Sequence, residues 1–278
     1  MRRALAPVLL ALCWAQAAPV KAAGWRFRWQ AGQVLTYRVE QQTRAAETTR
    51  EGTTQTTTAM SLVKRWRVLA VDAAGVATVQ HSLDWLRIET ATPSGEKLLF
   101  DSRTPDKSDP QMREQLGKYV GVPLATLRVD AVGRVVEVKE SKFGPASRFE
   151  AELPFAVVLP DAAPKAGQAW QREYNITLEP PQGTGEKYAA VQKYTCKSAE
   201  GAGAVIALAT EAKAQPEAVD DRIPLLKLQP EGEVVFDVAA GRVQGVRLKV
   251  DRELKNHQGE GSSYHFQSNY SEQFAGDK

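Results

Sequence analysis

Histidines are the first side chains to consider for chemistry, because imidazole binds metals and transfers protons near neutral pH. The chain has three of them, His81, His257 and His265. None has a histidine partner at the short spacing that brings two ligands to one metal ion. His81 falls in a strand pattern among apolar residues, where a buried structural histidine is the ordinary interpretation. The histidines therefore predict no metal site.

Carboxylates gather in the stretch "FDSRTPDKSDP", where Asp101, Asp106 and Asp109 lie near serine hydroxyls. Calcium favours oxygen ligands of this kind. The order of the acids and the glycine of a calcium loop are missing, however, and Asp109 directly precedes Pro110, where it would cap a helix. We expect neither a metal nor another cofactor.

Nucleophilic catalysis has weak support. The chain lacks a Gly-x-Ser-x-Gly turn, and its Ser-x-x-Lys matches are "SLVK" at 61–64 and "SGEK" at 94–97. That spacing works on a helix, whereas a strand would point Ser61 and Lys64 to opposite faces. Paired carboxylates for hydrolysis could still be assembled from distant strands. We expect no catalytic residue and keep a hydrolase as the less favoured alternative.

Aromatic side chains are the remaining candidates for a binding site. Aromatics on a strand face usually pack a core. The functional alternative is that some of them line a cleft for an apolar ligand or an extended peptide, because such pockets are mostly apolar. The candidates for lining such a cleft are Trp66, Trp85, Tyr264, Phe266 and Tyr270.

The elements that would position these residues are mostly strands. In "VLTYRVE" the residues Leu35, Tyr37 and Val39 alternate with polar ones, which indicates a half-buried strand. The stretch "AMSLVKRWRVLAVD" continues this pattern. Lys64 interrupts its apolar face, so we expect the Lys64 stem to reach the rim with its ammonium in water.

A turn at "DAAG" leads into a return strand, "VATVQHSLDWLRIE". Its apolar register slips to Leu86 and Ile88, which predicts a β-bulge. Before the slip, the residues expected to face inward are Ala77, Val79, His81, Leu83 and Trp85.

Two short helices are predicted, in "SDPQMREQLGKYVG" with Asp109 as the N-cap and in "FGPASRFEAELPF" near Pro145. The stretch "KAQPEAVDDRIPLLKLQPEG" is expected to be a proline-containing connection. The polar "TRAAETTREGTTQTTTA" predicts a long solvated hairpin, because threonine favours strands. A disordered loop is the alternative, since this segment has little apolar surface to bury.

Residues 1–22 have the pattern of a cleaved signal peptide: a short positive start, the apolar run "ALAPVLLALCWA" and small residues before Ala17 and Ala22, either of which could be the cleavage point. Anchoring through a lipid on Cys13 is disfavoured because the bulky Leu12 precedes it. We therefore expect export to the periplasm or the exterior. No later segment is long and apolar enough to cross a membrane.

Removal of residues 1–22 changes the charge and the cysteine count. It takes Arg2, Arg3 and Lys21 from the 36 basic residues and nothing from the 33 acidic ones, which leaves 33 of each. A nearly neutral chain offers no general attraction for nucleic acid. Cys196 is then the lone cysteine, and we expect a buried thiol, with a cross-chain disulfide or a reactive thiol as alternatives.

A repeated stretch suggests internal duplication. "AGQVLTY" begins at residue 31 and "AGQAWQR" at residue 166, and each starts a strand pattern. Each half also contains a hairpin with Asp, Gly and Arg-Val in the same order, "DAVGRV" and "DVAAGRV". We therefore predict a mostly β protein with two duplicated, curved antiparallel sheet modules, residues 23–158 and 159–278. The modules could pack face to face as a β-sandwich or share the helices near Met112 and Phe149. A single large continuous sheet is the alternative.

These features together resemble an uncharacterised family of exported bacterial β-rich proteins defined as a domain of unknown function. The shared motifs are "AGQVLTY", "VLAVDAAG", "LP" at 159–160 followed by "AGQAW", and the Asp-Gly-Arg-Val hairpin. The family often has Asp at the position of Gln168. In outline the predicted fold is also similar to periplasmic lipoprotein carriers, whose curved sheet wraps an apolar cavity. Fold likeness alone says little about function.

The function expected from the sequence is therefore binding without catalysis, in an exported envelope protein. The ligand would be lipid-like, or a partner protein would add a strand to a sheet edge. A structural protein that presents the Thr-rich hairpin to a partner is a further alternative. The sequence leaves the oligomeric state open.

Overall fold

The computed structural model describes residues 24–277 except 145–148, 150–156, 179–181, 201–202 and 218. The predicted signal peptide and Cys13 lie outside the described residues. So does most of the second predicted helix, "FGPASRFEAELPF", of which Phe143, Gly144 and Phe149 are described.

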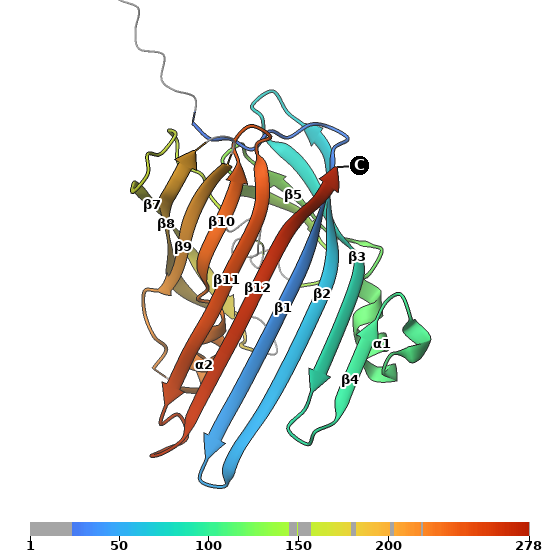
Figure 1. The fold of residues 1–278 in the computed structure, drawn as a ribbon, viewed down its shortest axis with the longest axis vertical. Helices are drawn as coiled ribbons and strands as arrows, with labels where there is room; N and C mark the ends of the chain where they lie inside the picture. Colours follow the sequence, from blue (N-terminus) through green and yellow to red (C-terminus); the bar gives the residue numbers. More distant parts are fainter. Residues whose placement is uncertain are drawn as a thin grey trace, which may run out of the picture.

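The described chain is mostly β, with two short α-helices, which confirms the predicted class (Figure 1). The elements in chain order are β1 Val34–Thr49, β2 Gly52–Val71, β3 Ala77–Ala91, β4 Lys97–Asp101, η1 Pro105–Lys107, α1 Pro110–Leu116, η2 Gly117–Tyr119, β5 Pro123–Val129, β6 Val135–Ser141, β7 Ala169–Leu178, β8 Glu186–Glu200, β9 Gly203–Ala212, α2 Val219–Lys227, β10 Glu231–Asp237, β11 Arg242–Lys255 and β12 Ser263–Asp277.

The strands of the described residues form one antiparallel sheet in the order β6-β5-β3-β2-β1-β12-β11-β10-β9-β8-β7, with β4 on β3. The expected β-sandwich is therefore wrong. The reason is the pairing of β1 with β12, which runs from Leu35 opposite Asp277 to Thr48 opposite Ser263 and joins the two halves edge to edge. Figure 1 shows these two strands side by side in the middle of the sheet.

The two "AGQ" stretches occupy equivalent positions at the starts of β1 and β7. Gly32 and Gly167 both have φ +83°, the left-handed region that favours glycine. The Gly32 N–H donates to the carbonyl of Val68 on β2, and the Gly167 N–H donates to that of Cys196 on β8. Both turns therefore hold the first strand of a half against its second strand. The descent of the halves from one duplicated module stays a prediction.

One face of the sheet is apolar and lines a single main core. Leu35, Val68 and Leu127 from the first half and Ile206 and Phe236 from the second half belong to the same buried cluster. We call this side the inner face and the opposite side the outer face. The sheet curls so that both halves contribute to one core, and no disulfide is needed to hold them.

The segment before β1 fastens the two halves at one end. The N–H of Phe27 donates to Ala131, and the N–H of Arg28 donates to Gly241, in the two Asp-Gly-Arg-Val hairpins. The Phe27 ring stacks on Trp29 with centroids 5.1 Å apart and meets Phe236 edge-on at 5.2 Å. These contacts pack the segment before β1 against both halves of the main core.

Several local predictions are confirmed. Asp109 caps α1, since its carboxylate accepts from the Met112 N–H at 3.0 Å. The Thr-rich segment forms the hairpin of β1 and β2, with Thr49 opposite Gly52, and so is ordered strand. A β-bulge in β3 is also present, since the register between β2 and β3 slips between Val63 and Lys64, one position before the predicted place.

The stretch expected to be a connection, residues 213–232, contains α2, so that expectation is wrong. Pro224 lies inside this helix. Leu225 is fully buried against Ile176, Leu178 and Ala190 on the inner face of β7 and β8. Burial of this apolar side outweighs the weak helix propensity of a proline-containing segment.

Candidate functional site

The inner face contains an apolar cavity of about 640 Å³, which we call the inner cavity. Its floor is formed by β1, β2, β3 and β12, and residues near η2, β5, β6 and α2 cover it. Figure 1 shows α1 beside β4 at one edge of the sheet and α2 toward the other edge, with the long central strands between them. The lining residues are Val39, Gln41, Met60, Leu62, Lys64, His81, Leu83, Leu86, Ile88, Tyr119, Leu124, Phe143, Phe149, Leu228 and Tyr270.

The β-bulge on β3 shapes the wall of the inner cavity. Lys64 pairs with Leu83, and Val63 pairs with Trp85, so Asp84 is the extra residue. As a result both Leu83 and Leu86 face the inner cavity, which strict alternation forbids. The bulge thus adds an apolar side chain to the wall.

The same bulge directs the Trp85 side chain away from the inner cavity. The sequence placed Trp85 on the inward set, but its partner Val63 and its contacts lie on the outer face. There the Arg103 guanidinium stands 4.4 Å from the Trp85 ring centroid, and the indole Nε1 donates to Asp101 Oδ1 at 2.9 Å. The expectation that Trp85 faces inward is wrong because the register slips one position earlier than predicted.

The other predicted lining residues all point to the inner face, and Tyr270 reaches the inner cavity. Trp66 is 2% exposed and packs between Tyr37 and Trp29 in the main core. Tyr264 and Phe266 lie near the start of β12, each with its ring centroid 5.6 Å from Lys227 Nζ. Tyr270 is therefore the member of the predicted set that lines the inner cavity.

A polar cluster lies at the wall of the inner cavity, where the sequence predicted only a lysine stem. Lys64 Nζ is 2.6 Å from Glu272 Oε2, and the hydroxyl of Tyr270 donates to the same oxygen at 2.6 Å. The Lys64 and Glu272 side chains are 5% and 0% exposed. The expectation that Lys64 reaches water is wrong, because the carboxylate of Glu272 on β12, two strands away in the sheet, offers a buried partner.

Sequence reasoning missed Glu272 entirely. On β12 it lies two residues from Tyr270 and from Phe274, so it shares their face of the strand, the apolar one. The available signal in the sequence was that Lys64 and Glu272 each interrupt an apolar strand face. Their pairing depends on β1 lying between β2 and β12, which strand patterns alone do not reveal.

The three histidines lie in three different parts of the structure. His81 is 6% exposed and lines the inner cavity, as expected for a buried residue of an apolar face. His257 Nε2 lies 3.0 Å from Glu47 Oε1, and His265 Nε2 lies 2.7 Å from Asp251 Oδ1. Within the described ranges, no group of three or more His, Cys, Asp or Glu side chains is arranged to hold a metal ion.

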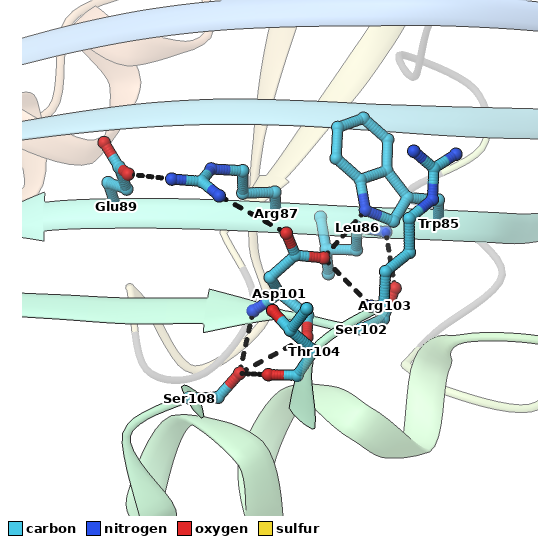
Figure 2. Close-up of polar contacts among 9 residues, drawn as sticks. All are labelled: Trp85, Leu86, Arg87, Glu89, Asp101, Ser102, Arg103, Thr104 and Ser108. Carbon is cyan, nitrogen blue, oxygen red and sulfur yellow. Dashed lines mark hydrogen bonds and ion pairs between the residues drawn. The ribbon is translucent and has the colours of Figure 1, made fainter. Parts of the chain in front are cut away.

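The Asp101 region is built as a structural network on the outer side (Figure 2). Burial raises the pKa of the Asp101 carboxyl, but hydrogen bonds from the Arg103 N–H, Trp85 and Arg87 outweigh this and hold it below its usual value. The Asp101 N–H donates to Ser108 Oγ at 2.9 Å, which ties β4 to the turn before α1. These donors occupy the Asp101 carboxylate, and the helix cap occupies that of Asp109. The backbone fastens the start of α1 to the sheet, since the Asp109 N–H donates to the Leu99 carbonyl of β4 at 2.7 Å.

Cys196 is a buried free thiol, as the ordinary interpretation of the sequence predicted. It lies on the inner face of β8, and burial raises its pKa. A thiol in this position is protonated at neutral pH and is shielded from reagents in water.

No helix within the described part of the chain is long and apolar enough to span a membrane. No protein-family model matches the chain, and no curated protein matches it. The resemblance to an exported family therefore stays a prediction.

Two solved structures align with most of the chain at low similarity. DynF from the dynemicin biosynthesis pathway of Micromonospora chersina has 10% identity and a TM-score of 0.21, over 98% of this chain and 92% of that one. A chain of the MucA/MucB complex of Pseudomonas aeruginosa has 9% identity and a TM-score of 0.14, over 85% of this chain and 89% of that one. These values are too low to carry an argument about function.

Proposed function

We propose that this protein binds a lipid-like apolar ligand in the inner cavity. The single observation that supports this most is the cavity itself, about 640 Å³ and lined largely by aliphatic and aromatic side chains. Ligand pockets in proteins are typically about 300–1,000 Å³ and mostly apolar, with a few polar groups that fix orientation. The inner cavity matches that description in volume and in lining.

The composition of the wall favours an extended hydrocarbon chain. Aliphatic side chains approach from three parts of the chain, Met60 on β2, Ile88 on β3 and Leu228 just after α2, and the unbranched Met60 can adapt to a chain that bends. Each buried methylene of a ligand contributes about 0.8 kcal/mol. A chain of several methylenes would therefore gain useful affinity without any strong polar contact.

Export fits this proposal, since a carrier or sensor of lipid-like molecules would act at the cell envelope. The signal peptide predicted at residues 1–22 is the support for that location. The proposed function is binding alone, with no catalytic residue assigned at the inner cavity.

The test is to fill the inner cavity. Met60→Trp adds bulk at the cavity wall, whereas Ala59→Trp adds a larger increment on the adjacent residue, which faces outward on β2. We expect Met60→Trp to weaken binding of the neutral dye N-phenyl-1-naphthylamine by about tenfold, from steric overpacking. Ala59→Trp is expected to bind like the unmodified chain, and dye fluorescence provides the measurement.

Folding of both variants is checked by circular dichroism before titration. Equal dye affinity in the Met60→Trp and unmodified proteins would place the dye elsewhere and end the proposal. Absence of dye binding to the unmodified chain at micromolar concentration would end it as well.

A further inference from the structure

We infer that the ligand of the inner cavity is electrically neutral, an amphiphile whose polar end can donate a hydrogen bond, such as a hydroxyl or an amide. The inference rests on the proposed function, because it concerns the chemistry of the ligand at the same site. It comes from the charge balance of the polar cluster, Lys64, Tyr270 and Glu272.

The polar cluster joins one cation to one anion. The Lys64 ammonium lies 2.6 Å from Glu272 Oε2, so one positive and one negative charge sit together with almost no exposure to water. Among the described residues that line the inner cavity, Lys64 is the one lysine, arginine, aspartate or glutamate, and its ammonium is directed at Glu272. The pair therefore presents no net charge to a ligand.

An ionised ligand would disturb this balance. A carboxylate or phosphate brought into the inner cavity gives up its hydration, and burying a charge is costly unless a partner compensates it. To recruit Lys64, an anion would have to compete with Glu272, which would then be a buried carboxylate without its ammonium. A cation faces the reverse conflict with Lys64.

A neutral polar group avoids both conflicts. The hydroxyl of Tyr270 lines the inner cavity, and it lies 3.4 Å from Lys64 Nζ and 2.6 Å from Glu272. A ligand hydroxyl can donate to the Tyr270 oxygen, whose own hydrogen is directed at Glu272, and this contact adds no net charge. The apolar remainder of the ligand then lies along Met60 and Ile88.

The experiment compares three ligands of equal chain length, 1-decanol, decanoate and decylammonium, by calorimetric titration at pH 8. For the unmodified chain we expect 1-decanol to bind about tenfold or more tightly than either ion. Decanoate binding as tightly as 1-decanol, or more tightly, would overturn the inference while leaving the proposed function intact. If none of the three binds, the proposed function itself has failed.

A variant of the polar cluster tests its role by chemical rescue. Lys64→Ala removes the ammonium and leaves space in front of the Glu272 carboxylate, where the head of decylammonium can take its place. Its affinity for decylammonium should rise about tenfold or more relative to the unmodified chain, while affinity for 1-decanol changes less. Lys193→Ala is the matched control, since it removes the same charge from an exposed pair with Glu211.

A folded Lys64→Ala protein that gains no affinity for decylammonium would contradict the role given to the polar cluster. If that variant does not fold, the three-ligand comparison on the unmodified chain still decides the inference.

Discussion

Replacing Lys64 by methionine is expected to lower the free energy of unfolding by about 3–5 kcal/mol. Methionine retains the length and the apolar stem of lysine but leaves the carboxylate of Glu272 buried without its ammonium. The Glu272 side chain is 0% exposed, so water cannot take over that role. Urea unfolding followed by tryptophan fluorescence measures the change.

Two companion variants separate this effect from a general loss of charge. Lys193→Met breaks an ion pair in which both side chains are 51% exposed, and it should cost no more than about 1 kcal/mol. The double variant Lys64→Met with Glu272→Leu removes both buried charges and should regain most of the stability. If Lys64→Met and Lys193→Met had equal effects, the buried pair would not have the energetic role described here.

Replacing Phe236 by alanine is expected to cost about 3–5 kcal/mol of stability. Phe236 is fully buried on β10, and its ring meets Phe27 edge-on across the main core. The truncation leaves a void where the segment before β1 packs against the second half of the sheet. The same urea titration reports the loss.

Val235 supplies the matched control, because it is adjacent on β10 and 37% exposed on the outer face. Val235→Ala should change stability by no more than about 0.5 kcal/mol. A similar cost for the two truncations would mean that the inner face of β10 is not the side that packs the core.

Much of the fold could be predicted from alternation in single strands. Leu35, Tyr37 and Val39 face the core as expected, and Cys196 on β8 is buried as expected. These predictions succeed because the apolar side of a half-buried strand is fixed by residues two apart. The cap at Asp109 succeeds for a similar local reason.

The failures depend on contacts between distant segments. Alternation cannot tell whether two sets of strands stack as a sandwich or join at an edge, and the β1–β12 pairing decides that question here. The helix α2 is fixed by burial of Leu225 against β7 and β8, which its sequence alone does not indicate.

In the candidate site, too, features set by local alternation could be predicted, whereas features set by distant contacts could not. Tyr270 could be found as an aromatic residue on an apolar strand face, and it does line the inner cavity. The placement of Trp85 depends on the position of one bulge, and the partner of Lys64 lies 208 residues away in sequence. Neither could be derived from local patterns.

The most direct test of ligand binding in the inner cavity is a crystal structure of the chain soaked with 10-bromo-1-decanol, collected at the bromine absorption edge. The account predicts an anomalous bromine peak inside the inner cavity, bounded by Met60, Ile88 and Leu228, with the hydroxyl end toward Tyr270. Bromine peaks only on the outer face or at lattice contacts, with clear density for an empty inner cavity, would contradict it.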